Sequence, residues 1–110
     1  MLMPKYLELT VTDMAAAKAF YTQAFGIEFT DYGPEYAGAA AGGMEIAIAL
    51  GKEAKPPMLG FRTDDIATAR EVISGAGGEI LSETYEFPGG GRFHFRDPAG
   101  NEALYYQYDE

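Results

Sequence analysis

His94 is the one histidine of the chain, and it lies in the alternating run Arg92-Phe93-His94-Phe95-Arg96. An imidazole changes protonation state near neutral pH, so it can act as a general base or as a single metal ligand. A weak metal site would require Glu8, Glu45 or Glu102 to converge on the ring. A lone histidine in a strand is also commonly a hydrogen-bonded structural residue. The sequence alone leaves both interpretations open.

The composition excludes several other chemistries. The chain has no cysteine, which excludes disulfides, thiol catalysis and cysteine-bound zinc. The glycine run at 89–91 lacks the lysine and the helix that follow a phosphate-binding loop, so it is interpreted as a flexible hairpin loop. The net charge is −9 and the eight basic residues are spread thinly, which argues against a nucleic-acid partner. The same acidity would weakly attract a cationic ligand.

The first half of the chain predicts a strand, a helix and three further strands. Alternation predicts a strand at 5–11, and Thr12 or Asp13 can cap a helix that runs to residue 24. Phe20, Tyr21 and Phe25 share an apolar face of that helix, and Gly26 ends it. The further strands are expected at 27–32, 36–41 and 44–50.

The second half repeats this order after a linker at 51–57. Asp65 follows Asp13 by 52 residues, and Gly78 follows Gly26 by the same interval. The expected elements are a strand at 58–63, a helix at 65–74 with Ile66, Ala69, Val72 and Ile73 on one face, and strands at 79–85, 92–96 and 101–108. We therefore predict an α+β fold with two βαβββ modules, residues 4–51 and 58–109.

A chain of 110 residues fits one domain. No apolar run approaches the roughly 18 residues that span a bilayer, and the first residues do not resemble a signal peptide. We therefore expect a single cytoplasmic domain with no membrane partner.

The motifs Val11-Thr12-Asp13, Phe20-Tyr21 and Phe25-Gly26, together with the run from Phe93 to Glu102 that contains Asp97-Pro98-Ala99-Gly100-Asn101, resemble one family in this order. It is the glyoxalase/bleomycin resistance/extradiol dioxygenase, or vicinal oxygen chelate, superfamily. The resemblance covers nearly the whole chain. It implies that each module curls its strands around a cup with its helix outside, and that paired cups enclose one site. It also implies a homodimer, with modules paired within one chain or exchanged between two.

The resemblance places the metal ligands of metal-using relatives on the first and last strand of each half. The corresponding positions in this chain are Tyr6, Ala47, Met58 and Leu104. A divalent cation prefers histidine nitrogen or carboxylate oxygen, which none of these side chains supplies. We therefore predict no metal and no cofactor.

Strand alternation then divides the side chains between the two faces of each sheet. If Phe93 and Phe95 pack on the helix, Arg92, His94 and Arg96 face the cup. The residues expected to hold a ligand in the cup are Tyr6, Glu8, Glu45, Met58, Arg62, His94, Glu102, Leu104 and Tyr106. Their mixture of aromatic, apolar and charged groups suits an organic molecule with a polar group. Alternatively, Glu45, Arg62, Arg96 and Glu102 simply pair with one another.

Three functions are consistent with these features. The favoured one is a metal-independent small-molecule binding protein, similar to the bleomycin-binding branch, with a cationic or aromatic organic ligand in the cup. A second is a metal-dependent glyoxalase-like lyase or isomerase, or a dioxygenase, with unorthodox ligands such as His94 and Glu102. A third is a dimeric interaction module without a ligand. Whether any reaction is catalysed stays open.

Overall fold

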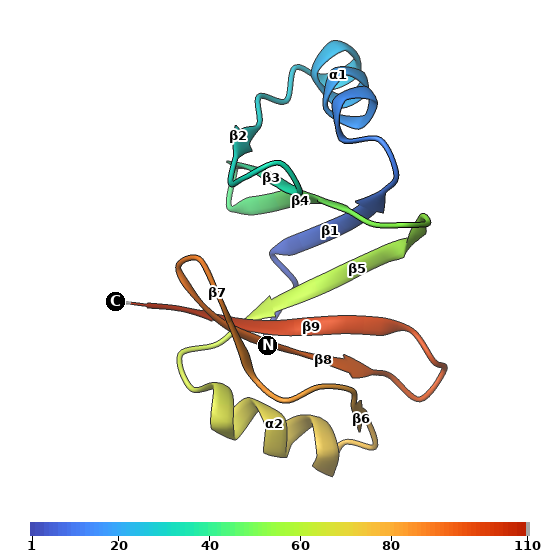
Figure 1. Cartoon of the computed structure of the whole chain (residues 1–110). Coiled ribbons are helices and arrows are strands. Elements are labelled where there is room, and N and C mark those ends of the chain that lie inside the picture. The colour runs from blue at the N-terminus through green and yellow to red at the C-terminus, as the bar shows by residue number, and fades with distance from the viewer. Residues whose placement is uncertain (110) are drawn as a thin grey trace. The chain divides into compact units, whose positions relative to one another are not determined.

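A computed structural model describes residues 1–109 of the chain (Figure 1). Its contacts divide the chain into two units, one formed by Lys5–Pro57 and the other by the chain from Met58 onward together with Met1–Pro4. We call them module one and module two. Within the described residues no helix is both long and apolar enough to cross a membrane.

Module one contains a mixed sheet and one helix. Its elements are β1 (Tyr6–Val11), α1 (Met14–Phe25), β2 (Thr30–Asp31), β3 (Tyr36–Ala41) and β4 (Met44–Leu50). The strand order is β2-β3-β4-β1, with β1 parallel to β4 and the other pairs antiparallel. A parallel pair requires a crossover connection, and α1 lies within that connection.

Helix α1 begins and ends where the sequence predicts. The Asp13 carboxylate accepts a hydrogen bond from the Ala16 amide at 3.0 Å, which satisfies one of the donors left open at a helix start. Gly26 adopts a left-handed conformation with φ 73°, and its amide donates to the Thr22 carbonyl at 2.8 Å. Glycine adopts this conformation without strain, so it ends the helix.

The apolar face of α1 is largely exposed. No residue of α1 is buried, and Phe20 and Phe25 are 58% and 67% exposed. The rings of these two residues and of Tyr21 pack against one another, with centroids 5.1 to 6.3 Å apart. The shared apolar face predicted from helical spacing is therefore a cluster of rings on the surface of this helix.

Module two repeats the element order with one addition. Its elements are β5 (Lys55–Arg62), α2 (Ile66–Gly75), β6 (Glu79–Ile80), β7 (Tyr85–Phe87), β8 (Gly90–Arg96) and β9 (Glu102–Tyr108). The order is β5-β9-β8-β6, with β5 parallel to β9, and β7 pairs antiparallel with β8. The strand predicted at 79–85 is thus two short strands. Strand β5 begins within the segment predicted as a linker, although only Leu59–Arg62 pairs with β9.

The hairpin of β7 and β8 also changes the role of the glycine run. Gly89 lies in the turn with φ 103°, whereas Gly90 and Gly91 pair with Tyr108 and Gln107 of β9. A Cβ atom on Gly90 would lie 2.0 Å from the Gln107 carbonyl oxygen. The interpretation of this run as a flexible loop is therefore wrong for Gly90 and Gly91, where absent side chains allow close pairing.

The core of module two lies between α2 and its sheet. Ala69 of α2 packs with Phe93 and Phe95 of β8 and with Ala103 and Tyr105 of β9, and Phe61, Ile66, Ile73 and Ile80 pack partly buried around them. The Phe93 and Tyr105 rings stack with centroids 5.9 Å apart. The prediction that Phe93 and Phe95 pack on the helix is confirmed. Val72, expected on the same face, is 55% exposed.

Candidate functional site

Strand β8 carries core residues on one face of the module-two sheet and polar residues on the other. Because Phe93 and Phe95 enter the core, alternation places Arg92 and His94 on the opposite face. In the β8–β9 ladder His94 lies opposite Leu104, and Arg96 lies opposite Glu102. Glu102 is therefore a diagonal neighbour of His94, within reach of its ring.

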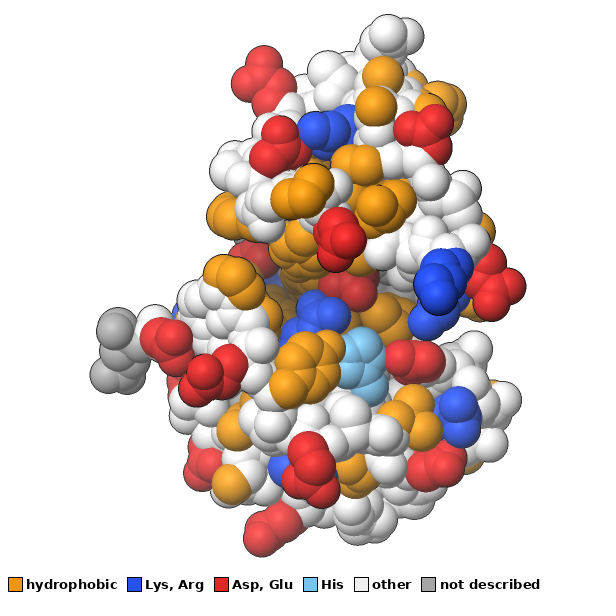
Figure 2. All heavy atoms as spheres, in the orientation of Figure 1, with side chains coloured by type: hydrophobic (Ala, Val, Ile, Leu, Met, Phe, Trp, Pro, Cys, Tyr) orange, Lys and Arg blue, Asp and Glu red, His pale blue; other side chains and the backbone are white. Residues whose placement is uncertain are grey.

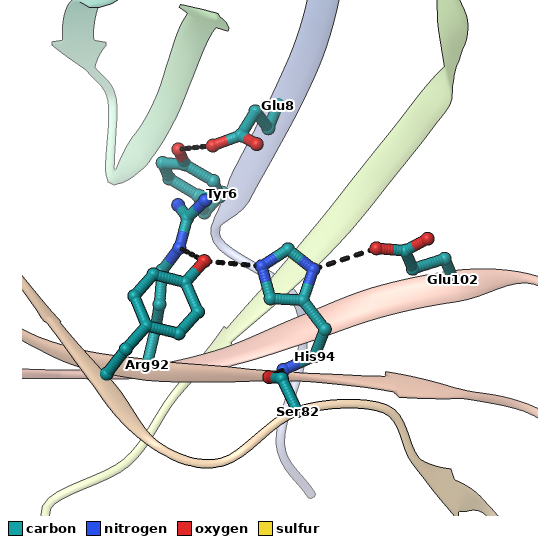
Figure 3. Close-up of polar contacts among 7 residues, drawn as sticks. Tyr6, Glu8, Ser82, Arg92, His94 and Glu102 are labelled. Carbon is teal, nitrogen blue, oxygen red and sulfur yellow. Dashed lines mark hydrogen bonds and ion pairs between the residues drawn. The ribbon is translucent and has the colours of Figure 1, made fainter.

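Both ring nitrogens of His94 have hydrogen-bonding partners (Figure 3). Its Nδ1 lies 2.8 Å from Glu102 Oε2, and its Nε2 lies 2.6 Å from the Tyr85 hydroxyl. An ionised carboxylate can only accept, so Nδ1 donates to Glu102 and, in the neutral ring, Nε2 accepts from Tyr85. The side chain is 16% exposed and the imidazole is visible at the surface in Figure 2.

The backbone of His94 is equally well held. Its amide donates to Ser82 Oγ at 3.0 Å, and its carbonyl accepts from the Leu81 amide at 2.9 Å. These two bonds tie β8 to the segment between β6 and β7. The ring is thus fixed from its backbone as well as from both nitrogens, which favours a single orientation.

Tyr85 is the functional candidate that the sequence reasoning missed. It lies on β7 directly opposite Arg92, and Arg92 Nε donates to its hydroxyl oxygen at 2.6 Å. The guanidinium carbon lies 5.4 Å from the centroid of the Tyr85 ring. The Tyr85 and His94 rings are inclined by only 19° with centroids 5.7 Å apart. A two-residue turn at Pro88-Gly89 would have been the sequence signal, because it pairs Tyr85 with Arg92 across the hairpin.

Module one contains a group of hydrogen-bonded side-chain oxygen atoms. The Tyr6 hydroxyl donates to Glu8 Oε1 at 2.7 Å and also hydrogen-bonds the Tyr36 hydroxyl. Tyr6 and Glu8 are both buried. Burial, followed by the nearby charge of Glu8, raises the pKa of Tyr6 far above its ordinary value. The Tyr6 phenol therefore stays protonated and acts as a donor. Tyr36 was not among the predicted site residues.

The other predicted site residues have more varied surroundings. In module one, Glu45 lies beside Tyr6 in the β1–β4 ladder. In module two, Met58 and Leu104 are buried, and Leu104 lies between Gly60 and His94 across its two ladders. The Arg62 guanidinium lies 4.8 Å from the Tyr108 ring centroid, and the Tyr106 ring contacts the same tyrosine at 5.2 Å.

Within the described residues, Arg96 and Glu102 have other partners than each other. Arg96 bonds Glu79 at 3.0 Å, and Glu102 bonds His94 instead of an arginine. The exposed Arg96–Glu79 pair contributes little stability. Glu102 is therefore committed to orienting the imidazole.

The four positions that correspond to metal ligands in the family offer a poor donor set. Ala47 and Leu104 carry no donor atom, and the Tyr6 phenol is protonated and hydrogen-bonded. Among residues 1–109, no group of three or more histidine, aspartate or glutamate side chains could hold a metal ion. His94 and Glu102 together supply two donor groups, whereas a tetrahedral site built only from protein ligands needs four.

Comparison with known proteins adds independent findings. A protein-family model described as Glyoxalase/Bleomycin resistance protein/Dioxygenase superfamily matches residues 4–104. The curated protein "Putative glyoxylase CFP32" of Mycobacterium bovis is 28% identical over 88% of this chain, which spans only 42% of that protein's length. A second curated protein with the same name, from Mycobacterium tuberculosis, matches equally.

Solved structures confirm the fold. Methylmalonyl-CoA epimerase from Mycobacterium tuberculosis aligns with a TM-score of 0.80 and 12% identity, covering 97% of this chain and 88% of that one. The Mn(II)-bound glyoxalase from Novosphingobium aromaticivorans aligns with a TM-score of 0.74 and 22% identity, covering 97% of this chain and 40% of that one. At these identities the likeness shows the fold alone. The predicted α+β vicinal oxygen chelate fold is confirmed.

Proposed function

Because the chain belongs to the Glyoxalase/Bleomycin resistance protein/Dioxygenase superfamily, we propose that it binds a small organic molecule without a metal. The ligand lies on the polar sheet faces that the family resemblance assigns to the cup. The observation that carries this proposal is the fixed polar face of module two, where Glu102, His94, Tyr85 and Arg92 form one hydrogen-bonded chain.

Such a face suits recognition of an organic ligand. Binding sites are typically apolar and aromatic surfaces with a few polar groups in fixed positions. Here His94 lies opposite the buried Leu104 in the β8–β9 ladder, and Arg92 lies opposite the buried Tyr106. Because the polar groups are already oriented, a ligand would pay little entropy to order them. The aromatic rings and the net charge of −9 favour an aromatic or cationic ligand.

A thermal-shift screen tests this proposal. Protein treated with a chelator is heated with cationic glycopeptides and with aromatic metabolites, and a true ligand raises the melting temperature because it binds only the folded state. Glu102→Gln should weaken the shift, since it removes a negative charge from the site. Glu71→Gln is the matched control, since Glu71 lies on the exposed surface of α2. No shift with any compound, or equal loss in both variants, would contradict the proposal.

A metal-dependent enzyme is the second candidate, and one observation favours it. His94 Nδ1 and Glu102 Oε2 lie 2.8 Å apart, so two ligand types preferred by divalent cations are already adjacent. One structural relative is a Mn(II)-bound glyoxalase. Elemental analysis of the protein as purified separates the candidates, because stoichiometric manganese, iron, nickel or zinc would favour the enzyme over the binding protein.

The homodimer and the cytoplasmic location remain part of the proposal. The exposed rings of Phe20 and Phe25 on α1 are apolar surface of the kind that association covers. Light scattering after size-exclusion chromatography measures the mass directly. A monomer at micromolar concentration would remove the homodimer from the proposal while leaving ligand binding intact.

A further inference from the structure

We propose that Tyr85 is a nucleophilic residue that accepts acyl groups from activated carboxylic esters, with His94 as its general base and Glu102 as the residue that positions His94. This activity goes beyond ligand binding and does not depend on the identity of any ligand. It rests on a chain of contacts that lies entirely within module two.

The three side chains have the geometry of a nucleophile, a base and an orienting acid. The Tyr85 hydroxyl lies 2.6 Å from His94 Nε2, and His94 Nδ1 lies 2.8 Å from Glu102 Oε2. A nucleophile within hydrogen-bond reach of a base, which is itself oriented by a third group, is the arrangement that activates hydroxyl groups for covalent catalysis. The carboxylate of Glu102 also stabilises the imidazolium that forms when His94 takes a proton.

Arg92 completes the arrangement at the reacting oxygen. Its Nε donates to the Tyr85 hydroxyl at 2.6 Å, and the two residues are directly paired in the β7–β8 ladder. A positive group at this distance stabilises negative charge that develops on the oxygen as its proton leaves. Tyr85 is 39% exposed, so part of this residue is open to solvent.

Tyr85 supplies the hydroxyl that contacts the imidazole, at 2.6 Å from His94 Nε2. The chain has no cysteine. The Ser82 hydroxyl lies against the same residue, but its Oγ accepts from the backbone amide of His94. Tyr85 is therefore the hydroxyl that we assign as the nucleophile.

The reaction balances without any oxidant, reductant or metal. The Tyr85 oxygen attacks the carbonyl carbon of the ester as its proton moves to His94 Nε2. The tetrahedral adduct then expels the alcohol or phenol, which takes that proton from His94. The product is an aryl ester of Tyr85 and the free leaving group. Water, deprotonated by His94, can then cleave the aryl ester and regenerate the tyrosine.

p-Nitrophenyl acetate is the probe, since p-nitrophenolate release is visible and the acetyl group is detected by mass. We expect a burst of one equivalent of p-nitrophenolate, slower release afterwards as water cleaves the aryl ester, and an acetyl group mapped to the peptide that contains Tyr85. Tyr85→Phe should abolish that modification. His94→Gln should slow acetylation about 100-fold, within the range of general-base contributions. Glu102→Gln should slow it less, because the amide oxygen still accepts from Nδ1.

Tyr32→Phe is the matched control, since Tyr32 is exposed and belongs to module one. The Tyr32→Phe variant should be acetylated at Tyr85 as fast as the unmodified protein. In the unmodified protein, Tyr32 should be acetylated no faster than free tyrosine. The ¹⁵N spectrum of the only imidazole should show a changed Nδ1 signal in Glu102→Gln, which separates positioning from general destabilisation. Equal acetylation of Tyr32 and Tyr85, or an unchanged rate in His94→Gln, would overturn the proposal. Neither outcome would affect ligand binding.

Discussion

The two modules share an element order but bury their aromatic residues differently. In module two, α2 covers a cluster built on Phe93, Phe95 and Tyr105. In module one, α1 has no buried residue, and Phe20 and Phe25 stay exposed. The buried residues of its strands include the small side chain of Ala37. A repeated fold therefore does not imply a repeated core, because the strands of module one carry no phenylalanine.

Replacing one phenylalanine in each module should give the largest difference in stability between the two modules. Phe93→Ala should reduce the free energy of unfolding by about 3–5 kcal/mol, since it leaves a cavity in a packed core. Phe20→Ala should change it by roughly 0.5 kcal/mol or less, as expected for an exposed site. Urea unfolding followed by circular dichroism measures both. Equal losses would show that α1 is packed as tightly as α2.

Strand glycines give a second, smaller contrast. Gly90→Ala places a Cβ atom 2.0 Å from a backbone oxygen of β9, so the hairpin must shift, at a cost of about 1–3 kcal/mol. Gly38→Ala on β3 of module one meets the Tyr32 ring at 3.5 Å, an ordinary contact. The Ile46 carbonyl oxygen, at 3.7 Å, is the second atom near that Cβ and is also at an ordinary distance. The unfolding midpoint of Gly38→Ala in urea should therefore stay close to that of the unmodified protein. A tolerated Gly90→Ala would show that the β7–β8 hairpin is looser than its register indicates.

The dependence of the unfolding free energy on acid pH tests the turn that precedes β9, and we expect this effect to be the smallest of the three. Hydrogen bonds from Asn101 hold the pKa of Asp97 below its ordinary value of 3.8. A carboxyl group whose pKa is lowered by folding stabilises the native state above its unfolded pKa. That contribution is lost as the pH falls through the folded value. The unfolding free energy of Asp97→Asn should therefore fall less between pH 5 and pH 2 than that of the unmodified protein.

The opposite result, a steeper acid dependence in Asp97→Asn, would contradict the hydrogen-bonded turn. The corresponding turn of module one, at Gly42-Gly43, has no aspartate. Substitutions there should leave the acid dependence unchanged. Urea titrations at each pH supply the free energies for both turns.

Much of module two could be predicted from sequence because its signals are local. Alternation along β8 separates Phe93 and Phe95 from His94, and the Asp97 turn fixes where β9 begins. The contact of Glu102 with His94 was considered but could not be deduced, since it depends on a diagonal reach across the β8–β9 ladder.

Two features of the structure could not be predicted from the sequence, for different physical reasons. Tyr85 was missed because residues 79–85 were interpreted as one strand, whereas the hairpin register that brings it to Arg92 depends on close pairing at Gly90. The exposure of α1 was missed because helical periodicity identifies an apolar face but not what covers it.

Strand β8 carries His94 between two core residues, Phe93 and Phe95. The residue proposed to act as a base therefore alternates along one strand with the residues that pack the core. Exchanging His94 for another side chain would leave the rings beneath it in place, which makes this position a natural choice for a library that seeks new reactivity. Exchanging Phe93 or Phe95 would tilt the strand and carry the imidazole away from Tyr85. Laboratory evolution of the site should therefore accept changes at Arg92, His94 and Arg96 and reject them at Phe93 and Phe95.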